Sequence, residues 1–452
     1  MLLASVLVFA ASIAAPGAAV ASGATTTTTG TLPDGATYLI QVPDPWNGTL
    51  LLYSHGYVTP GSPNPPHDVG DPLTGAYLLG QGYALAGSSY ATTGWALQQA
   101  IPDQLATLDA FDAAYRVPDR TIAWGHSLGG IITAGLLQTA PDRFTAALPM
   151  CGVLAGGVGT WNQGLDAEFA IQQLLPGGST LQIARITSPG TNLGHAEGVI
   201  AAAQGSPAGR ARLALSSALG DLPGWFTPGS PEPPATDYTS QEANQFLWIT
   251  QVDAPFLFAL RAELEFRAGG NPSWNTGINY AKQLQMSTDY AEVVALYQAA
   301  GLSLDGDLAT LAAAPRTAAD PGAVDYLTQW ISFNGELSGK PVLTLHTTGD
   351  GLVDVTDEQA YRSVVQDAKD SQLLRQAYVH RAGHCAFTPA ETIAALGALT
   401  QRLDTGKWTG AADPANLNAN AAALGPSLNT LPESFIDFSP APFLRPYDLG
   451  SH

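Results

Sequence analysis

Short apolar runs alternate with amphipathic segments in the first third of the chain. Patterns typical of buried strands cover residues 38–42, 49–53, 83–86, 120–124 and 144–150, and helical spacing covers 73–81, 98–115 and 131–137. Because strands that alternate with helices form parallel sheets covered on both faces, this order predicts an α/β fold. Asn47-Gly48, between the first two of these strands, is a typical hairpin turn and predicts that they pair.

The alternation stops after Cys151 and resumes at residue 341. Apolar runs at 341–346 and 374–380 predict two more strands, and 389–403 predicts a closing helix. The roughly 190 residues between the two halves match the length of a typical domain and carry helical spacing throughout. We therefore predict a sheet-bearing core with an inserted helical cap and a surface-wrapping tail. The predicted parts are the core at 31–156 and 339–404, the cap at 157–338 and the tail at 405–452.

The N-terminal residues predict a targeting segment. Residues 1–21 are apolar, too short to span a bilayer comfortably, and end in Ala19-Val20-Ala21, a pattern typical of a signal-peptide cleavage site. We predict cleavage after Ala21 and secretion; a buried N-terminal helix is the alternative. The threonine-rich stretch at 22–30 predicts a flexible leader.

Composition narrows the range of partners. The chain carries a net charge of −20 with only 18 Lys and Arg, which argues against nucleic acid and against anionic membrane surfaces. No later segment has the length and composition of a membrane span, and we expect a monomer. Cys151 and Cys385 predict a disulfide in an oxidising compartment, with two separate buried thiols as the alternative.

Gly125-His126-Ser127-Leu128-Gly129 fits the G-x-S-x-G pattern of a nucleophile elbow. A strand pattern precedes it and a helical pattern follows it, as the elbow requires. Ser127 is therefore predicted to be a catalytic nucleophile, and a structural glycine-rich turn is the alternative. His126 is expected to pack beneath the serine without taking its proton.

A serine hydroxyl needs a base, and that base needs an orienting carboxylate. On this fold the order is Ser, then Asp or Glu, then His. Asp350 follows the strand that resumes the sheet and is the predicted acid, with Asp354 as the second candidate. His384 follows the last strand on a loop and is the predicted base, whereas His380 lies within that strand.

An oxyanion hole requires two N–H donors. Leu128, after the nucleophile, should supply one, and Tyr57, in the His55-Gly56-Tyr57 loop, should supply the other. No cofactor or metal is expected: the sequence has no dinucleotide pattern, and 305–307 (Asp-Gly-Asp) is better explained as a turn than as a calcium loop.

Together these motifs resemble the α/β-hydrolase superfamily over about residues 31–156 and 341–403. The His-Gly-Tyr loop and Ser-Leu-Gly-Gly resemble secreted esterases and lipases, which implies hydrolysis of a small or polymeric carboxylic ester through an acyl-enzyme. A peptidase or amidase of the same fold, and an acyltransferase, are the alternatives. A peptidase would need carboxylates in the insert to hold a substrate amine, with candidates at Glu242, Glu263 and Glu265.

Overall fold

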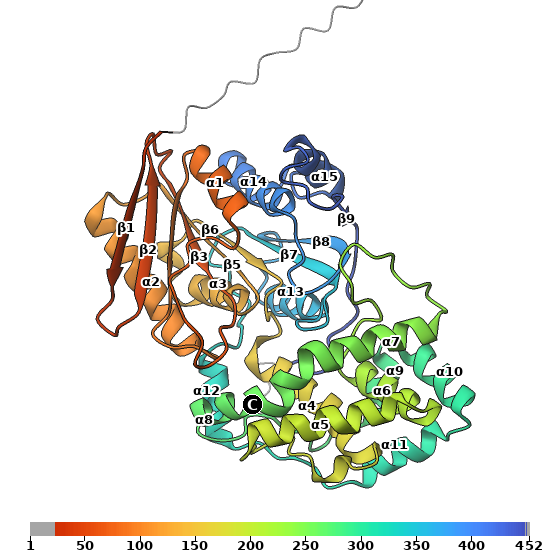
Figure 1. Ribbon diagram of the computed structural model, residues 1–452. Helices are drawn as coiled ribbons and strands as arrows, with labels where there is room; N and C mark the ends of the chain where they lie inside the picture. Colours follow the sequence, from red (N-terminus) through yellow and green to blue (C-terminus); the bar gives the residue numbers. More distant parts are fainter. Residues whose placement is uncertain (1–22, 448, 450–452) are drawn as a thin grey trace, which may run out of the picture.

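The computed structural model describes residues 23–447 and residue 449. These residues form a nine-stranded sheet in the order β1-β2-β4-β3-β5-β6-β7-β8-β9 (Figure 1). The strands from β4 through β3 to β8 run parallel, and β1, β2 and β9 pair antiparallel at the two edges. Their bounds are β1 (Thr25–Thr31), β2 (Thr37–Pro43), β3 (Thr49–Ser54), β4 (Ala84–Ser88), β5 (Arg120–His126), β6 (Ala146–Met150), β7 (Val342–Gly349), β8 (Leu374–Ala382) and β9 (Phe435–Ile436).

Both faces of the sheet are covered, as the continuous apolar strands require. Leu50 and Leu52 of β3 point to one face of the sheet and pack with one group of helices. Leu51 and Tyr53 point to the other face and pack with a second group. The first group is α2 (Leu97–Ala114), α3 (Leu128–Thr139) and α13 (Asp357–Asp367), and the second is α1 (Pro72–Gly80), α14 (Pro389–Thr405) and α15 (Pro414–Ala423). The predicted α/β fold is confirmed, and it is the α/β-hydrolase fold.

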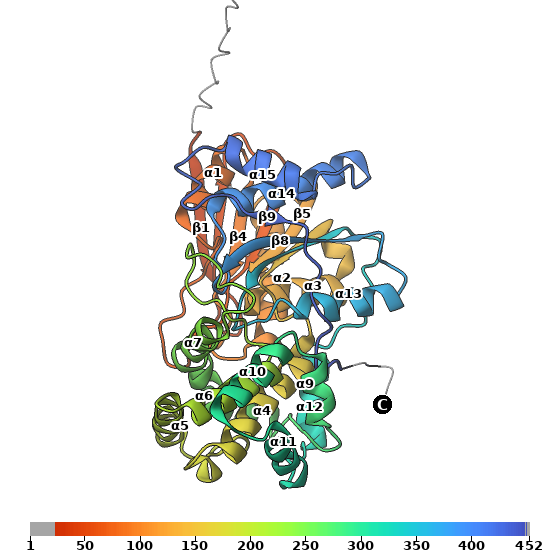
Figure 2. The same ribbon diagram turned by 90° about the vertical axis from the view of Figure 1, so that its right-hand side faces the viewer.

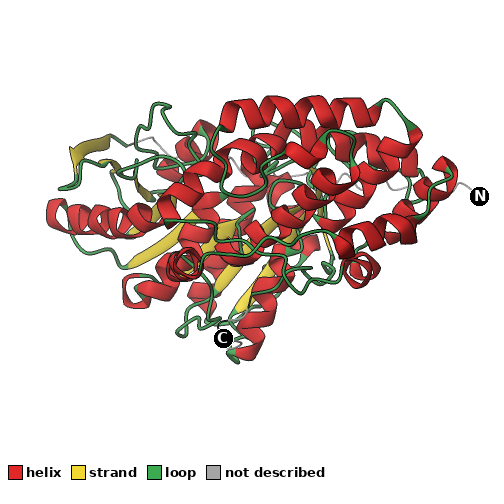
Figure 3. Cartoon of the chain, turned by 90° about the horizontal axis from the view of Figure 1, so that it is seen from below, coloured by secondary structure: helices red, strands yellow, loops and turns green. Residues whose placement is uncertain are grey.

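A helical cap lies beyond the end of the sheet at which the central parallel strands terminate (Figures 1 and 2). From below, its helices extend across the strands (Figure 3). The cap has a hydrophobic core of its own. Its helices are α4 (Gly156–Leu174), α5 (Pro189–Gln204), α6 (Pro207–Leu219), α7 (Tyr238–Trp248), α8 (Arg261–Ala268), α9 (Tyr280–Met286), α10 (Tyr290–Ala300), α11 (Leu304–Ala313) and α12 (Pro321–Gln329).

Short helical turns complete the structure. Between α7 and α8 the chain forms two π-helical turns, η3 (Ile249–Asp253) and η4 (Phe256–Leu260), so that the segment is continuous but changes its pitch twice. Two 3₁₀ turns, η1 (Pro141–Arg143) and η2 (Gly178–Thr180), follow α3 and α4.

The predicted hairpin between β2 and β3 is wrong. β4 lies between these strands and pairs with both. Asn47 binds the turn that precedes β4 instead: its N–H donates to Gly82 O at 2.8 Å and its Nδ2 donates to Gln81 O at 3.1 Å. Gly48 does have a positive φ, 87°, but the hydrogen-bond partner of Asn47 is a segment 34 residues away.

The predicted flexible leader is also wrong over most of its length. Thr25–Thr31 forms β1, which pairs with all of β2 in an antiparallel ladder. Threonine is β-branched and suits an edge strand with one exposed face, so this threonine repeat forms a strand rather than a flexible linker. The predicted signal peptide, residues 1–21, lies outside the described residues. Within the described chain, no helix combines the length and apolar character needed to cross a bilayer.

The tail does more than wrap the surface. It contributes α15 and β9 to the core, and it then reaches the cap. There the buried Arg445 side chain forms an ion pair with Asp166 at 2.5 Å and donates to Trp274 O at 2.7 Å. The C-terminal segment therefore connects the core to the cap.

Candidate active site

Ser127 lies at the sharp turn between β5 and α3, with φ 58° and ψ −124°. This backbone conformation is strained for a residue with a side chain, and strain of this kind is typical of a nucleophile elbow. The neighbouring glycines are required by close packing. A Cβ on Gly129 would lie 1.9 Å from Ser54 O, and one on Gly125 would lie 2.4 Å from the same atom.

The structure brings the three predicted catalytic side chains into one hydrogen-bonded chain. His384 Nε2 lies 2.8 Å from Ser127 Oγ, and His384 Nδ1 lies 2.7 Å from Asp350 Oδ2. Asp350 directly follows β7, and His384 lies on the loop after β8, so adjacent parallel strands deliver both groups to the same edge. This geometry suits proton removal from the serine by the histidine.

Asp350 is buried and kept ionised by its surroundings. Burial alone would raise the pKa of its carboxyl group, but His384, His346 and the Val353 N–H together hold that pKa below its ordinary value. Asp350 Oδ1 also accepts hydrogen bonds from Leu352 N at 3.0 Å and Val353 N at 3.1 Å. A carboxylate held in this way fixes the imidazole that it contacts.

His346, on β7, is a residue that the sequence analysis missed. Its Nδ1 lies 3.2 Å from Glu358 Oε1 and its Nε2 lies 2.9 Å from Val353 O. Burial acts to lower the pKa of His346, but the hydrogen bond and charge of Glu358 outweigh it and raise the pKa to about 9. A charged imidazole thus lies behind Asp350.

The predicted disulfide between Cys151 and Cys385 is present, with its Cα atoms 5.3 Å apart. Cys151 follows β6, and Cys385 follows His384 directly. The bond therefore attaches the loop that bears the histidine to the end of β6, from which β8 is separated by β7.

The predicted oxyanion loop lies beside the serine. A Cβ on Gly56 would be 3.4 Å from Ser127 Cβ, which shows how closely this backbone approaches. Leu128 is the first residue of α3, so its N–H has no intrahelical acceptor, and no acceptor for the Tyr57 N–H lies within the described chain. His55 braces the loop through Gly56 O at 2.8 Å and Ser89 O at 3.2 Å.

The second candidates from the sequence lie elsewhere. Asp354 is not bonded to His384; its Oδ2 accepts from Gln163 Nε2 at 2.7 Å. His380 projects from β8 toward Glu232, with its Nε2 3.5 Å from Glu232 Oε2. His126 contacts Tyr53 at 3.2 Å, and burial lowers its pKa to about 4, in keeping with a packing role.

The residues at 305–307 begin α11 rather than a calcium loop. Asp305 and Asp307 lie in the first turn of this helix, where acidic side chains favour the helix dipole. Asp307 forms an ion pair with Arg212 at 2.7 Å.

A cavity of about 120 Å³ opens beside Ser127, between core and cap. This size is comparable with the roughly 150 Å³ cavity that accepts one benzene molecule in an engineered protein. Its walls are mainly apolar and aromatic, with Tyr57, Trp95, Trp161 and Phe256 among them. A compact aromatic group therefore fits the space next to the nucleophile.

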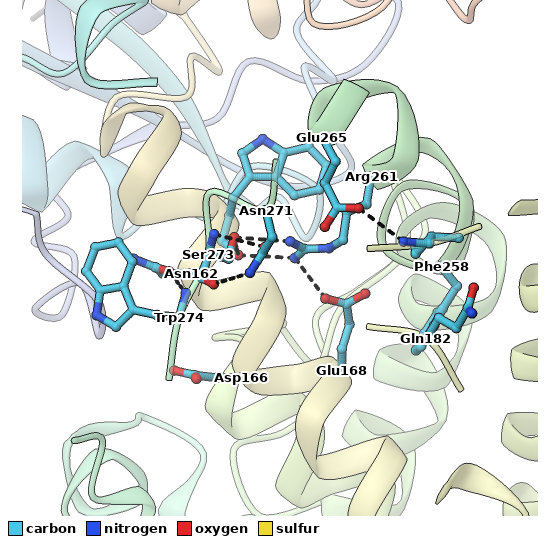
Figure 4. A network of polar contacts seen from close by, with 12 residues as sticks. Asn162, Asp166, Glu168, Gln182, Phe258, Arg261, Glu265, Asn271, Ser273 and Trp274 are labelled. Carbon is cyan, nitrogen blue, oxygen red and sulfur yellow. Dashed lines mark hydrogen bonds and ion pairs between the residues drawn. The ribbon is translucent and has the colours of Figure 1, made fainter. Parts of the chain in front are cut away.

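The cap contains a buried ion pair between Arg261 and Glu168 (Figure 4). Through Arg261 it supports the Trp161 wall of the cavity. Arg261 Nη2 lies 2.8 Å from Glu168 Oε2, and Arg261 Nη1 donates to Ser273 Oγ at 3.1 Å. The guanidinium also stacks over the Trp161 ring, 5.0 Å from its centroid. Removing either charge would leave the other buried and unpaired, so this wall is held firmly.

The three cap carboxylates that were candidates for holding a substrate amine in a peptidase do not line the cavity. Glu263 binds Arg267 at 2.8 Å, Glu265 accepts from Arg185 N at 2.7 Å, and Glu242 accepts from Gln204 at 3.2 Å. Two other acids, Asp253 on η3 and Asp354, line it instead. In the sequence, Asp253 stands out only as a single acid within the apolar run at 252–260. It lies on a π-helical turn, and the spacing of apolar residues does not predict such a turn.

The fold and this site define a serine hydrolase of the α/β-hydrolase superfamily. The chain belongs to the same family as the o-phthalyl amidase of Xanthobacter agilis, with 30% identity over 430 residues, which is 87% of this chain and 90% of that one. The pattern of the prolyl oligopeptidase family matches residues 77–156. Two solved structures are also similar: feruloyl esterase B from Aspergillus oryzae (14% identity, 84% of this chain and 81% of that one, TM-score 0.47) and an esterase from Aspergillus oryzae (13%, 84% and 80%, TM-score 0.48).

Proposed function

We propose that the protein hydrolyses carboxylic esters and amides through an acyl-enzyme on Ser127. The observation that carries the proposal is the chain of hydrogen bonds from Ser127 Oγ through His384 to Asp350, at 2.8 and 2.7 Å. The cavity beside the serine supports a compact, aromatic-sized group as the part of the substrate bound there.

The reaction follows from these positions. His384 Nε2 takes the proton of Ser127 as its Oγ attacks the carbonyl carbon, and Asp350 stabilises the resulting imidazolium. The N–H groups of Tyr57 and Leu128 bind the oxyanion. His384 then gives the proton to the departing alcohol or amine. A water molecule, deprotonated by His384, attacks the acyl carbon, and the proton returns to Ser127 as the acid leaves.

Two kinds of bond are supported by different observations. Ester hydrolysis follows from the resemblance of the motifs to secreted esterases. Amide hydrolysis is supported by the membership of the chain in a family that includes an amidase, matched over nearly its whole length. Amides demand a well-protonated leaving amine, which His384 is placed to supply.

A matched pair of substrates tests both. A 4-nitrophenyl ester and a 4-nitroanilide of the same benzoyl-type acid are compared for kcat/KM, with Ser127→Ala as the control for the site. We expect cleavage of both, lost in Ser127→Ala. Activity that survives Ser127→Ala would refute the site. Cleavage of the ester alone or of the anilide alone removes the other bond from the proposal.

We also propose that the protein is exported, with residues 1–21 as the signal peptide. The disulfide supports this, since such bonds persist in oxidising compartments. N-terminal sequencing of protein recovered from the medium tests it. A mature chain that begins at Ser22 is expected, and an intact Met1 in a cell-retained protein contradicts it.

A further inference from the structure

Asp253 is a buried carboxyl group without a partner. The residue is 8% exposed and lines the cavity beside Ser127, and its Oδ2 is buried without a hydrogen-bond partner within the described chain. A buried polar group in this state costs free energy that a native fold seldom tolerates without a functional reason. The group is therefore a candidate for binding a ligand.

Asp354 lies on the wall of the same cavity. One of its oxygens binds Gln163 and the other, Oδ1, is buried without a partner. The carboxyl group of Asp350 faces both Asp253 and Asp354. Asp221 and Asp357 also face Asp354. None of the residues that line the cavity is Lys, Arg or His. The cavity wall is therefore rich in unsatisfied acceptors and contributes no cation, whereas the charged His346 lies behind Asp350 and does not line the cavity.

We propose that Asp253 and Asp354 bind an ammonium group of the substrate, so that the natural substrate is an ester or amide that bears a primary amine. The inference rests on the proposed function and adds the substrate class. An ammonium group supplies three donors, which match the free oxygens of both acids. A carboxylate ligand would find no cation among the residues that line the cavity.

Binding an amine changes the protonation of these acids. Burial and the neighbouring carboxylates raise the pKa of both groups well above the ordinary range, which favours their protonated forms in the empty cavity. A bound ammonium group replaces those protons as the counter-charge. The acids ionise, and the protons pass to the solvent.

Ligand binding to the inactive variant Ser127→Ala tests the proposal separately from the reaction. Benzylammonium, benzyl alcohol and benzoate are titrated by calorimetry near neutral pH, in two buffers that differ in ionisation enthalpy. We expect benzylammonium to bind at least about tenfold more tightly than the other two, which corresponds to about 1.4 kcal/mol. Its binding should release protons to the buffer.

The acid is then changed in the same background. Asp253→Asn keeps the shape and should reduce the preference for benzylammonium at least about tenfold. Asp289→Asn is the matched control, because Asp289 is a half-buried acid of the cap that does not line the cavity. It should leave the preference unchanged. Thermal unfolding verifies that each variant is folded, and Asp354→Asn serves as a second variant if Asp253→Asn fails to fold.

Several results overturn the proposal. They are equal binding of the three probes, tighter binding of benzoate, absence of benzylammonium binding at its solubility limit, and an unchanged preference in Asp253→Asn. In the active enzyme, an ammonium-bearing ester should have a higher kcat/KM than its neutral isostere. If neither ester is cleaved, the proposed function fails, while the binding result remains valid for this site.

Discussion

His346 Nε2 lies 3.7 Å from Oδ2 of Asp350, the same oxygen that binds His384. Two imidazole groups therefore lie close to this oxygen. One is on β7, and the other is on the loop after β8. Because both imidazoles favour the ionised carboxylate, Asp350 is suited to orient His384 rather than to exchange protons itself.

Asp350→Asn should lower kcat by about 10⁴-fold, because an amide favours the wrong tautomer of His384. Steady-state hydrolysis of the 4-nitrophenyl ester measures this, with thermal unfolding as the check on folding. Asp119→Asn is the control, because Asp119 is an exposed acid that pairs with Arg116 and has no hydrogen bond to a residue of the site. A kcat within tenfold of the wild-type value would show that Asp350 is not the orienting acid.

Loss of the disulfide should destabilise the fold and the site together. The bond spans 234 residues, and the chain-entropy account gives a stabilisation of about 5 kcal/mol for a loop this long. The double variant Cys151→Ala/Cys385→Ala should lower the free energy of unfolding in urea and also kcat, since His384 adjoins Cys385. Wild-type protein treated with a reductant should behave alike, and full activity of the double variant would contradict this role.

Two glycine-to-alanine variants should change stability in opposite directions. At Gly129 a Cβ would lie 1.9 Å from Ser54 O and 2.8 Å from His55 O, so the elbow and the oxyanion loop must separate. Gly129→Ala should cost several kcal/mol, roughly 3 or more, and abolish activity. Gly397→Ala, in the open middle of α14, should add about 0.5–1 kcal/mol. Equal unfolding midpoints for the two variants would contradict the packing argument.

Stability should fall as the pH rises from 5 to 8. Burial raises the pKa of Asp221 to about 8 and that of Glu292 to about 9, whereas both groups ionise near pH 4 in the unfolded chain. Between these values the native state holds more protons, so unfolding becomes easier by roughly 1 kcal/mol per pH unit for each group. Urea unfolding at pH 5, 6.5 and 8 measures the slope. Asp221→Asn and Glu292→Gln should each make it shallower, and a slope of opposite sign would refute the assignment.

Local patterns predicted much of this structure. The apolar runs located the strands β2 to β8, because a strand buried on both faces needs an uninterrupted apolar segment. The motif around Ser127, and the positions of Asp350 and His384 just after strands, indicated residues that the fold then brought within hydrogen-bond distance. These signals are short-range, and each depends on a few neighbouring residues.

Long-range packing decided the rest. Asn47-Gly48 has the sequence of a hairpin turn, but the pairing of β4 with both β2 and β3 places β4 between these strands. Similarly, Ser127 and His384 are 257 residues apart, and their contact depends on the order of strands in the sheet.

The cap shows the same division most clearly. The spacing of its apolar residues predicted that the cap is helical. The same spacing did not predict the π-helical turn on which Asp253 reaches the cavity. Hydrophobic periodicity reports which residues a helix buries, but not which empty space its polar residues face. Local motifs were therefore enough to predict the type of reaction centre. The acids beside it became identifiable only from the folded chain, because segments distant along the sequence form their environment.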